Sequence, residues 1–137
     1  MKTRVVVVAV IENDGKILLG KKAKGVGPYP DAWQIPGGGA NLEEESLTDA
    51  LKREIREEVG IEIDNIRPVG FDEDTTYNKL NQLVHYVFLQ FYAQSKSDKV
   101  TPGDDIEYLE WVEKSNLENY NLCKPLKKLF KRMELIK

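Results

Sequence analysis

The sequence is poor in the residues on which many enzymes and secreted proteins depend. Its 137 residues include one cysteine, Cys123, and one histidine, His85. A single thiol cannot close a disulfide within the chain, and one cysteine with one histidine cannot build a Cys/His structural zinc site. A Ser/His/Asp triad would have to use His85, and no nucleophile motif surrounds it. If the chain is an enzyme, we therefore expect carboxylates to carry its chemistry.

A basic excess and a long apolar segment are also absent. The chain has 20 lysines and arginines against 23 acidic residues, a net charge of -3, whereas proteins that bind nucleic acid are usually basic. The longest apolar run, residues 5–11, is far shorter than the ~20 residues that a membrane-spanning helix needs. Acidic residues follow this run, and no small-residue cleavage site is present. We expect a cytoplasmic protein with neither nucleic-acid nor membrane partners.

Apolar patterning predicts one α/β domain over residues 1–137. The predicted strands, rich in β-branched and aromatic residues, are 5–11, 16–20, 82–93 and 107–112, with a hairpin turn at 13–16. Residues 21–41 contain five glycines and three prolines, which predicts mostly loop. Helix formers predict helices over 46–59, ended by Gly60, and roughly 124–134, with Pro125 near its start.

The first predicted helix carries an unusual group of acids. On a helical wheel Glu54, Glu57 and Glu58 share an arc of about 100°. This arc overlaps one edge of the apolar face, which includes Leu51 and Ile55, whereas a solvated helix would place its acids opposite that face. At ~6 Å and an effective dielectric of ~20, each pair of acids repels by about 3 kcal/mol before screening. The group therefore requires raised pKa values or a cation, and carboxylate oxygens bind hard divalent cations such as Mg²⁺.

Two neighbouring features support a ligand site beside these acids. On the same wheel Arg53 is placed to form an ion pair with Glu57 one turn later. Upstream, Gly37, Gly38 and Gly39 permit positive φ and let the backbone approach a ligand closely. A plain turn also explains three glycines in a row, and no Gly-Lys-Ser/Thr follows with the spacing of a Walker A loop.

These residues together match a known motif. Gly39, five residues, Glu45, seven residues and then 53–61 (REIREEVGI) fill every fixed position of the Nudix box. The chain thus resembles the Nudix hydrolases. The resemblance implies the Nudix fold, a mixed β-sheet sandwiched between α-helices. It also implies Mg²⁺-dependent hydrolysis of a nucleoside diphosphate linked to another moiety, with Mn²⁺ as a substitute for Mg²⁺.

The resemblance also implies roles for the residues of the box. It assigns metal binding and catalysis to Glu54, Glu57 and Glu58, assisted by a glycine carbonyl, which we place at Gly38. It makes Glu45 a structural partner of Arg53.

One departure concerns the loop before the helix. The stretch from Pro36 to Glu45 is one residue longer than is common, and Glu44 replaces the usual glycine. Whether Gly37 or Gly38 supplies the metal-facing carbonyl is therefore left open.

A weaker resemblance covers most of the chain. Four stretches resemble the MutT-like nucleoside triphosphatases that act on pyrimidine deoxynucleotides; they are 1–15, 27–33, 104–112 and 119–122. This branch implies a small-molecule nucleotide partner, a (deoxy)nucleoside triphosphate, cleaved to the monophosphate and pyrophosphate. ADP-ribose or nucleotide-sugar hydrolysis, and a non-catalytic nucleotide-sensing module, are the alternatives. A monomer and a homodimer both remain open.

Further candidates lie outside the box. Asp105 is expected to be a catalytic acid, although Asp-Asp after Pro-Gly is also an ordinary turn. Arg4 and Lys21 are expected to contact phosphates, and Lys22 beside Lys21 could do the same; surface ion pairs or solvated side chains are the alternative. Asn121 is expected to help select the base, because its amide both donates and accepts hydrogen bonds.

Overall fold

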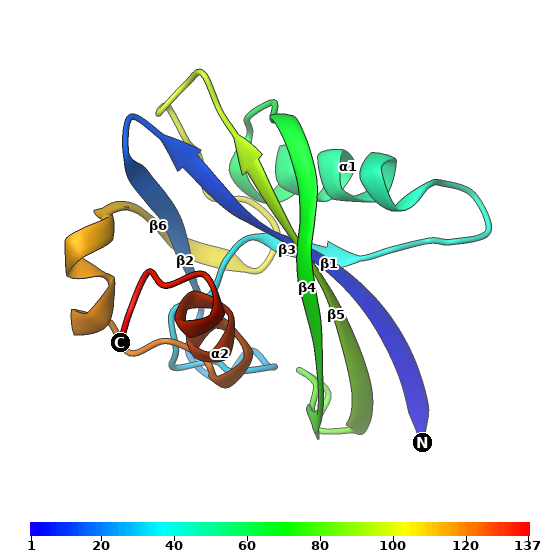
Figure 1. Cartoon of the computed structure of the whole chain (residues 1–137). Coiled ribbons are helices and arrows are strands. Elements are labelled where there is room, and N and C mark those ends of the chain that lie inside the picture. The colour runs from blue at the N-terminus through cyan, green and yellow to red at the C-terminus, as the bar shows by residue number, and fades with distance from the viewer.

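A six-stranded mixed β-sheet forms the centre of the computed structural model, which describes residues 1–137 (Figure 1). The strands are β1 (Lys2–Asn13), β2 (Lys16–Lys22), β3 (Gly37–Gly39), β4 (Asp64–Tyr77), β5 (Leu83–Gln94) and β6 (Ile106–Glu113). Their order is β4-β5-β1-β2-β6, and β3 also pairs with β1. The pair β1–β5 is parallel, and the other pairs are antiparallel. The sequence-based prediction of a mixed sheet is confirmed.

One helix covers each face of this sheet, as Figure 1 shows for α1 (Leu47–Val59) and α2 (Lys124–Arg132). Side chains alternate between the two faces of a strand, so β1 contributes to both layers. Val7 and Ala9 pack in one core cluster with Ile55 of α1. Val10 packs in a second cluster with Phe130 of α2. The predicted sandwich is therefore present, and a short 3₁₀-helix (η1, Lys114–Asn119) precedes α2.

The boundaries of α1 follow from its capping residues. The Ser46 hydroxyl accepts a hydrogen bond from the Asp49 N–H at 3.1 Å, which satisfies a free donor of the first turn. At the other end Gly60 adopts φ 76°, and its N–H donates to the carbonyls of Ile55 and Arg56. Both ends agree with the predicted helix. No helix in the structure combines the length and the apolar character needed to cross a lipid bilayer.

Two strands differ from the sequence-based expectation. Residues 37–39 lie within the stretch predicted to be mostly loop, yet they pair with β1 in the register Val6↔Gly39 and Val8↔Gly37. The 14-residue strand β4 was not predicted. It lies at the edge of the sheet, and most of its residues are exposed. Because its pairing with β5 comes from backbone hydrogen bonds and few of its side chains are buried, it carries no clear apolar alternation.

Candidate active site

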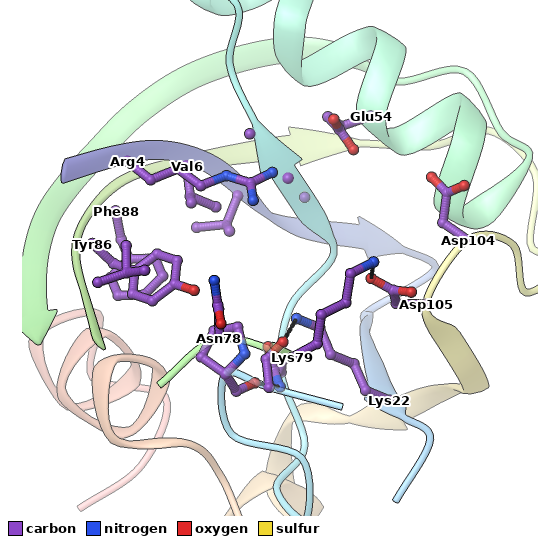
Figure 2. Close-up of a pocket in the computed structure, with 18 of the residues that line it drawn as sticks. Arg4, Val6, Lys22, Glu54, Asn78, Lys79, Tyr86, Phe88, Asp104 and Asp105 are labelled. Atoms are coloured by element: carbon purple, nitrogen blue, oxygen red, sulfur yellow. Dashed lines mark hydrogen bonds and ion pairs between the residues drawn. The ribbon is translucent and has the colours of Figure 1, made fainter. Parts of the chain in front are cut away.

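A cavity of about 890 Å³ lies beside the first half of β1 (Figure 2). Glycines of β3 and side chains of β1, β5, α1 and three loops line it. Figure 2 shows carboxylates on one side, aromatic rings on the opposite side and cationic side chains between them. The acids of its lining are Glu54, Glu58, Asp104 and Asp105; the cations include Arg4, Lys22 and Lys79; the rings are Tyr86 and Phe88.

Three carboxylates converge at the acidic side of this cavity. Glu54, Glu57 and Asp104 each offer one oxygen, and these oxygens lie within 4.8 Å of one another. We call these three residues the acidic cluster. Glu54 is half-buried, whereas the Glu57 side chain is 46% exposed. The helical wheel anticipated two members of the cluster, but Asp104 comes from the loop before β6.

Backbone contacts bring Asp104 to the helix. The N–H groups of Thr101 and Gly103 donate to the carbonyls of Val59 and Glu58, both at 2.9 Å, at the end of α1. A Cβ at position 103 would collide with the carbonyl oxygen of Glu57, so only glycine allows this approach. The loop therefore docks on the free carbonyls of the last helical turn and places Asp104 beside the glutamates.

Glu58 occupies the most enclosed position of the acids. It is 6% exposed, and one of its carboxylate oxygens accepts a hydrogen bond from the Gly37 N–H at 2.8 Å. Burial raises the pKa of Glu58 to about 8, although this hydrogen bond and Lys22 favour the charged form. Burial also raises the pKa of Glu54, against the effect of Arg53. Raised pKa values are one of the two alternatives, beside a bound cation, that the sequence left open for these acids.

Arg53 connects the acids to the loop before the helix. Its guanidinium donates to Glu45 at 2.6 and 3.0 Å, to Glu54 at 2.9 Å and to Glu57 at 3.3 Å. It also donates to the carbonyl of Gly39 at 3.1 Å. Both contacts expected from the sequence, Arg53 with Glu57 and Arg53 with Glu45, are present. The hydrogen bond with Glu45 raises the pKa of Arg53 and lowers that of Glu45.

The glycines of β3 leave space for these side chains. A Cβ at Gly38 would collide with the Glu54 carboxylate, the flexible end of a side chain. A Cβ at Gly37 would instead collide with the β1 backbone at Val7 and Val8. Gly38 thus lies directly against the acidic cluster, and Gly37 binds Glu58 through its N–H.

This difference predicts separate outcomes for two substitutions. Gly38→Ala should keep the melting temperature within about 2 °C and lower kcat roughly tenfold to a hundredfold, because Glu54 is displaced. Gly37→Ala should lower the free energy of unfolding by about 2 kcal/mol or more, because the backbone cannot move aside. Thermal melting and steady-state kinetics on both variants check this; a destabilised Gly38→Ala variant with unimpaired kcat would contradict it.

Three cations of the cavity, Lys2, Arg4 and Lys22, have no ion-pair partner. The Arg4 guanidinium lies against Gly39, where a Cβ would collide with it, and forms no salt bridge. Lys22 makes only a 3.5 Å contact with the Gly27 carbonyl, and burial lowers its pKa. Lys79 differs, because its ammonium lies 3.4 Å from Asp105. Unpaired cations beside an acidic cluster are suited to a bound polyanion.

The other expected substrate-binding residues lie elsewhere. Lys21 does not line the cavity; its ammonium lies 5.7 Å from the centre of the Trp33 ring. Lys22 lines the cavity instead, at the point where an extra residue in β6, Glu107, shifts the pairing of β2 with β6. Asn121 is also outside the lining, and its amide donates to the Asp31 carbonyl at 3.1 Å.

The cavity also contains residues that sequence reasoning missed as site candidates: Lys79, Tyr86 and Phe88. The sequence does contain a pattern for the two aromatic residues. Tyr86 and Phe88 are two positions apart on a predicted strand, so their side chains lie on the same face of the sheet. Lys79 has no such pattern, because its position depends on the turn between β4 and β5.

The fold and this site define the class of the protein. A family model of the NUDIX domain matches residues 1–133. The chain belongs to the Nudix family and is a Nudix hydrolase.

Relatives with known names agree with this assignment. The chain is 34% identical over 128 residues to a protein of Klebsiella pneumoniae (strain 342) named nucleoside triphosphatase NudI, covering 89% of this chain and 90% of that one. It is 30% identical to the protein of the same name from Enterobacter sp. (strain 638), covering 99% and 100%.

Solved structures show the same fold. A MutT NUDIX hydrolase from Burkholderia pseudomallei superposes with a TM-score of 0.78 at 26% identity, covering 96% of this chain and 98% of that one. The NUDIX domain of Shewanella oneidensis NrtR, complexed with ADP ribose, superposes with a TM-score of 0.76 at 17% identity, covering 99% and 90%. The second likeness concerns the fold alone.

Proposed function

We propose that the protein is a Mg²⁺-dependent hydrolase of nucleoside triphosphates that releases the monophosphate and pyrophosphate. The observation that supports this most is the order of groups in one cavity: an acidic cluster, unpaired cations, then aromatic rings. A triphosphate linked to a nucleoside presents the complementary order of metal-binding oxygens, further anionic oxygens and a flat apolar base. The nucleoside triphosphatases NudI, which resemble the chain over nearly its whole length, support the same substrate class.

The residues of the acidic cluster suit a divalent cation. They offer three carboxylate oxygens within 4.8 Å, the hard donors that Mg²⁺ and Mn²⁺ prefer. We assign metal binding to Glu54, Glu57 and Asp104, with Glu58 behind them. When bound, the metal neutralises charge on the phosphates and lowers the pKa of water for attack on phosphorus.

Other residues of the cavity would bind and orient the substrate. Arg4 and Lys22 supply fixed positive charge for phosphate oxygens that the metal leaves uncovered. Arg53 holds the carboxylates of Glu54 and Glu57 in place, and its bonds to Glu45 and Gly39 tie this arrangement to the preceding loop. We further propose a preference for pyrimidine deoxynucleotides and a cytoplasmic location, as the sequence suggested.

The two neighbouring aspartates test the assignment of the metal site. Asp104→Asn should lower kcat roughly tenfold or more at limiting Mg²⁺, with partial recovery at high Mg²⁺, because the cluster loses one charged oxygen. Asparagine tolerates the left-handed backbone of residue 104 (φ 49°), so the fold should be kept. Asp105→Asn is the matched comparison. If kcat falls further in Asp105→Asn than in Asp104→Asn, the result would contradict the assignment of Asp104 and support the catalytic role that the sequence predicts for Asp105.

Steady-state kinetics on a substrate panel tests the proposed function. The panel contains the common deoxynucleoside and ribonucleoside triphosphates, ADP-ribose and a nucleotide sugar at equal Mg²⁺. We expect the highest kcat/KM for a triphosphate. A higher kcat/KM for ADP-ribose or the sugar would overturn the substrate class, and no turnover of any compound would indicate a nucleotide-sensing module.

A further inference from the structure

Tyr86 of β5 is a buried residue whose hydroxyl is open to the cavity and has no partner in the protein. The residue is 3% exposed and lines the cavity, yet its hydroxyl makes no hydrogen bond within the protein. Figure 2 shows the hydroxyl pointing into the middle of the cavity. The hydroxyl of a tyrosine in an enclosed position normally has a hydrogen-bond partner, so one that is free and open to the cavity is available to a ligand.

The other tyrosines show that this arrangement is particular to Tyr86. The hydroxyls of Tyr29, Tyr92 and Tyr120 donate to the carboxylates of Asp74, Glu12 and Glu110 at 2.5, 3.1 and 2.8 Å. The two remaining tyrosines of the six are more than half exposed to solvent. Of the four tyrosines that are not exposed, Tyr86 is the most buried. It is also the only one of these four whose hydroxyl has no carboxylate partner.

The position of Tyr86 indicates which part of a nucleotide it meets. In the parallel pair β1–β5, Tyr86 lies beside Arg4. Its ring stacks on Phe88 with centroids 5.8 Å apart and planes 14° apart. Strand β5 is two strand spacings, about 10 Å, from β3, where the acidic cluster approaches. A substrate whose phosphates occupy the acidic and cationic groups therefore brings its nucleoside to Tyr86 and Phe88.

We propose that Tyr86 is a specificity-determining residue whose hydroxyl hydrogen-bonds to the nucleoside moiety of the substrate. This inference rests on the proposed function and adds the residue that distinguishes one nucleotide from another. A tyrosine hydroxyl both donates and accepts, so it can bind a sugar hydroxyl or a polar edge of the base. A nucleotide that supplies no partner there leaves the hydroxyl buried and unpaired, which lowers its relative kcat/KM.

The substitution Tyr86→Phe tests this, because it removes one oxygen and keeps the ring that packs on Phe88. Tyr92→Phe is the matched control: it removes the same atom from the same strand, but outside the cavity, where the hydroxyl binds Glu12. For each protein, kcat and KM are measured on the deoxynucleoside and ribonucleoside triphosphates. Inhibition by inorganic tripolyphosphate, which lacks a nucleoside, reports on the phosphate-binding groups alone.

We expect Tyr86→Phe to raise KM for the preferred triphosphate roughly tenfold while kcat stays within about twofold. Inhibition by tripolyphosphate should be unchanged, and Tyr92→Phe should behave like the wild type. If the hydroxyl binds the base, the kcat/KM values of Tyr86→Phe should differ less from base to base than those of the wild type. If it binds the sugar, the kcat/KM values for ribonucleotides and deoxynucleotides should differ less. An unchanged KM for every triphosphate, or an equal weakening of tripolyphosphate inhibition, would overturn the proposal.

Calorimetry separates this inference from the proposed function. Binding of nucleoside monophosphates to the wild type and to Tyr86→Phe is measured without turnover. If the wild type hydrolyses no triphosphate, the proposed function is wrong, and weaker monophosphate binding by Tyr86→Phe would still support the role of the hydroxyl. Equal affinity in both proteins, or no binding of any monophosphate to the wild type, would overturn it.

Discussion

Replacing Glu57 with glutamine is expected to lower kcat at saturating Mg²⁺ by roughly a hundredfold or more, about 2.7 kcal/mol in the activation barrier. The change removes one charged oxygen from the acidic cluster and keeps the shape of the side chain. The Glu57 side chain is 46% exposed, and Arg53 retains Glu45 and Glu54 as partners. The melting temperature should therefore stay close to that of the wild type.

Glu62→Gln is the control for this variant. Glu62 is an exposed acid just after α1 that forms an ion pair with Arg56 at 2.6 Å, outside the acidic cluster. Steady-state kinetics and thermal melting are measured on both proteins. Glu62→Gln should keep the activity of the wild type within about twofold. Near-wild-type turnover of Glu57→Gln at saturating Mg²⁺ would contradict the assignment of Glu57 as a metal ligand.

The second large effect is expected from Arg53→Ala, which should lower both stability and activity. The substitution leaves Glu45, Glu54 and Glu57 without their shared partner. Because Arg53 is about a third exposed, solvent screens part of the loss. We expect the free energy of unfolding to fall by about 1–2 kcal/mol, and the melting temperature by roughly 3–6 °C. Activity should fall more than tenfold, because the carboxylates are no longer held in place.

Two further variants make this prediction specific to Arg53. Arg56→Ala removes an arginine from the exposed side of the same helix and should change activity little. Arg53→Lys restores the charge but not the forked geometry of the guanidinium, so it should recover stability better than activity. An unchanged melting temperature with abolished activity in Arg53→Ala would instead make Arg53 a direct ligand of the substrate.

Local sequence was sufficient to predict the centre of the site. The helical period alone placed Glu54 and Glu58 at the inner edge of α1, and both are at least half-buried in the structure. Ser46 and Gly60 marked the ends of that helix because capping depends on neighbouring residues. The pairing of Arg53 with Glu57 followed from their spacing of one turn.

Other parts of the site depend on contacts between distant segments. Asp104 joins the acidic cluster because the loop 101–105 binds the last carbonyls of α1, and no periodicity reveals such docking. Lys22 takes the position in the cavity that was expected for Lys21, where a bulge in β6 shifts its pairing with β2. Strand β4 is an edge strand with mostly exposed residues, so backbone pairing with β5 defines it rather than an apolar pattern.

Analysis of the reaction products tests the central proposal most directly. Phosphorus NMR follows a pyrimidine deoxynucleoside triphosphate incubated with the purified protein and Mg²⁺, with Glu57→Gln as the paired sample. The proposed site predicts equal amounts of the nucleoside monophosphate and pyrophosphate from the wild type, and almost none from the variant. Release of the diphosphate and orthophosphate, or equal product from both proteins, would contradict it.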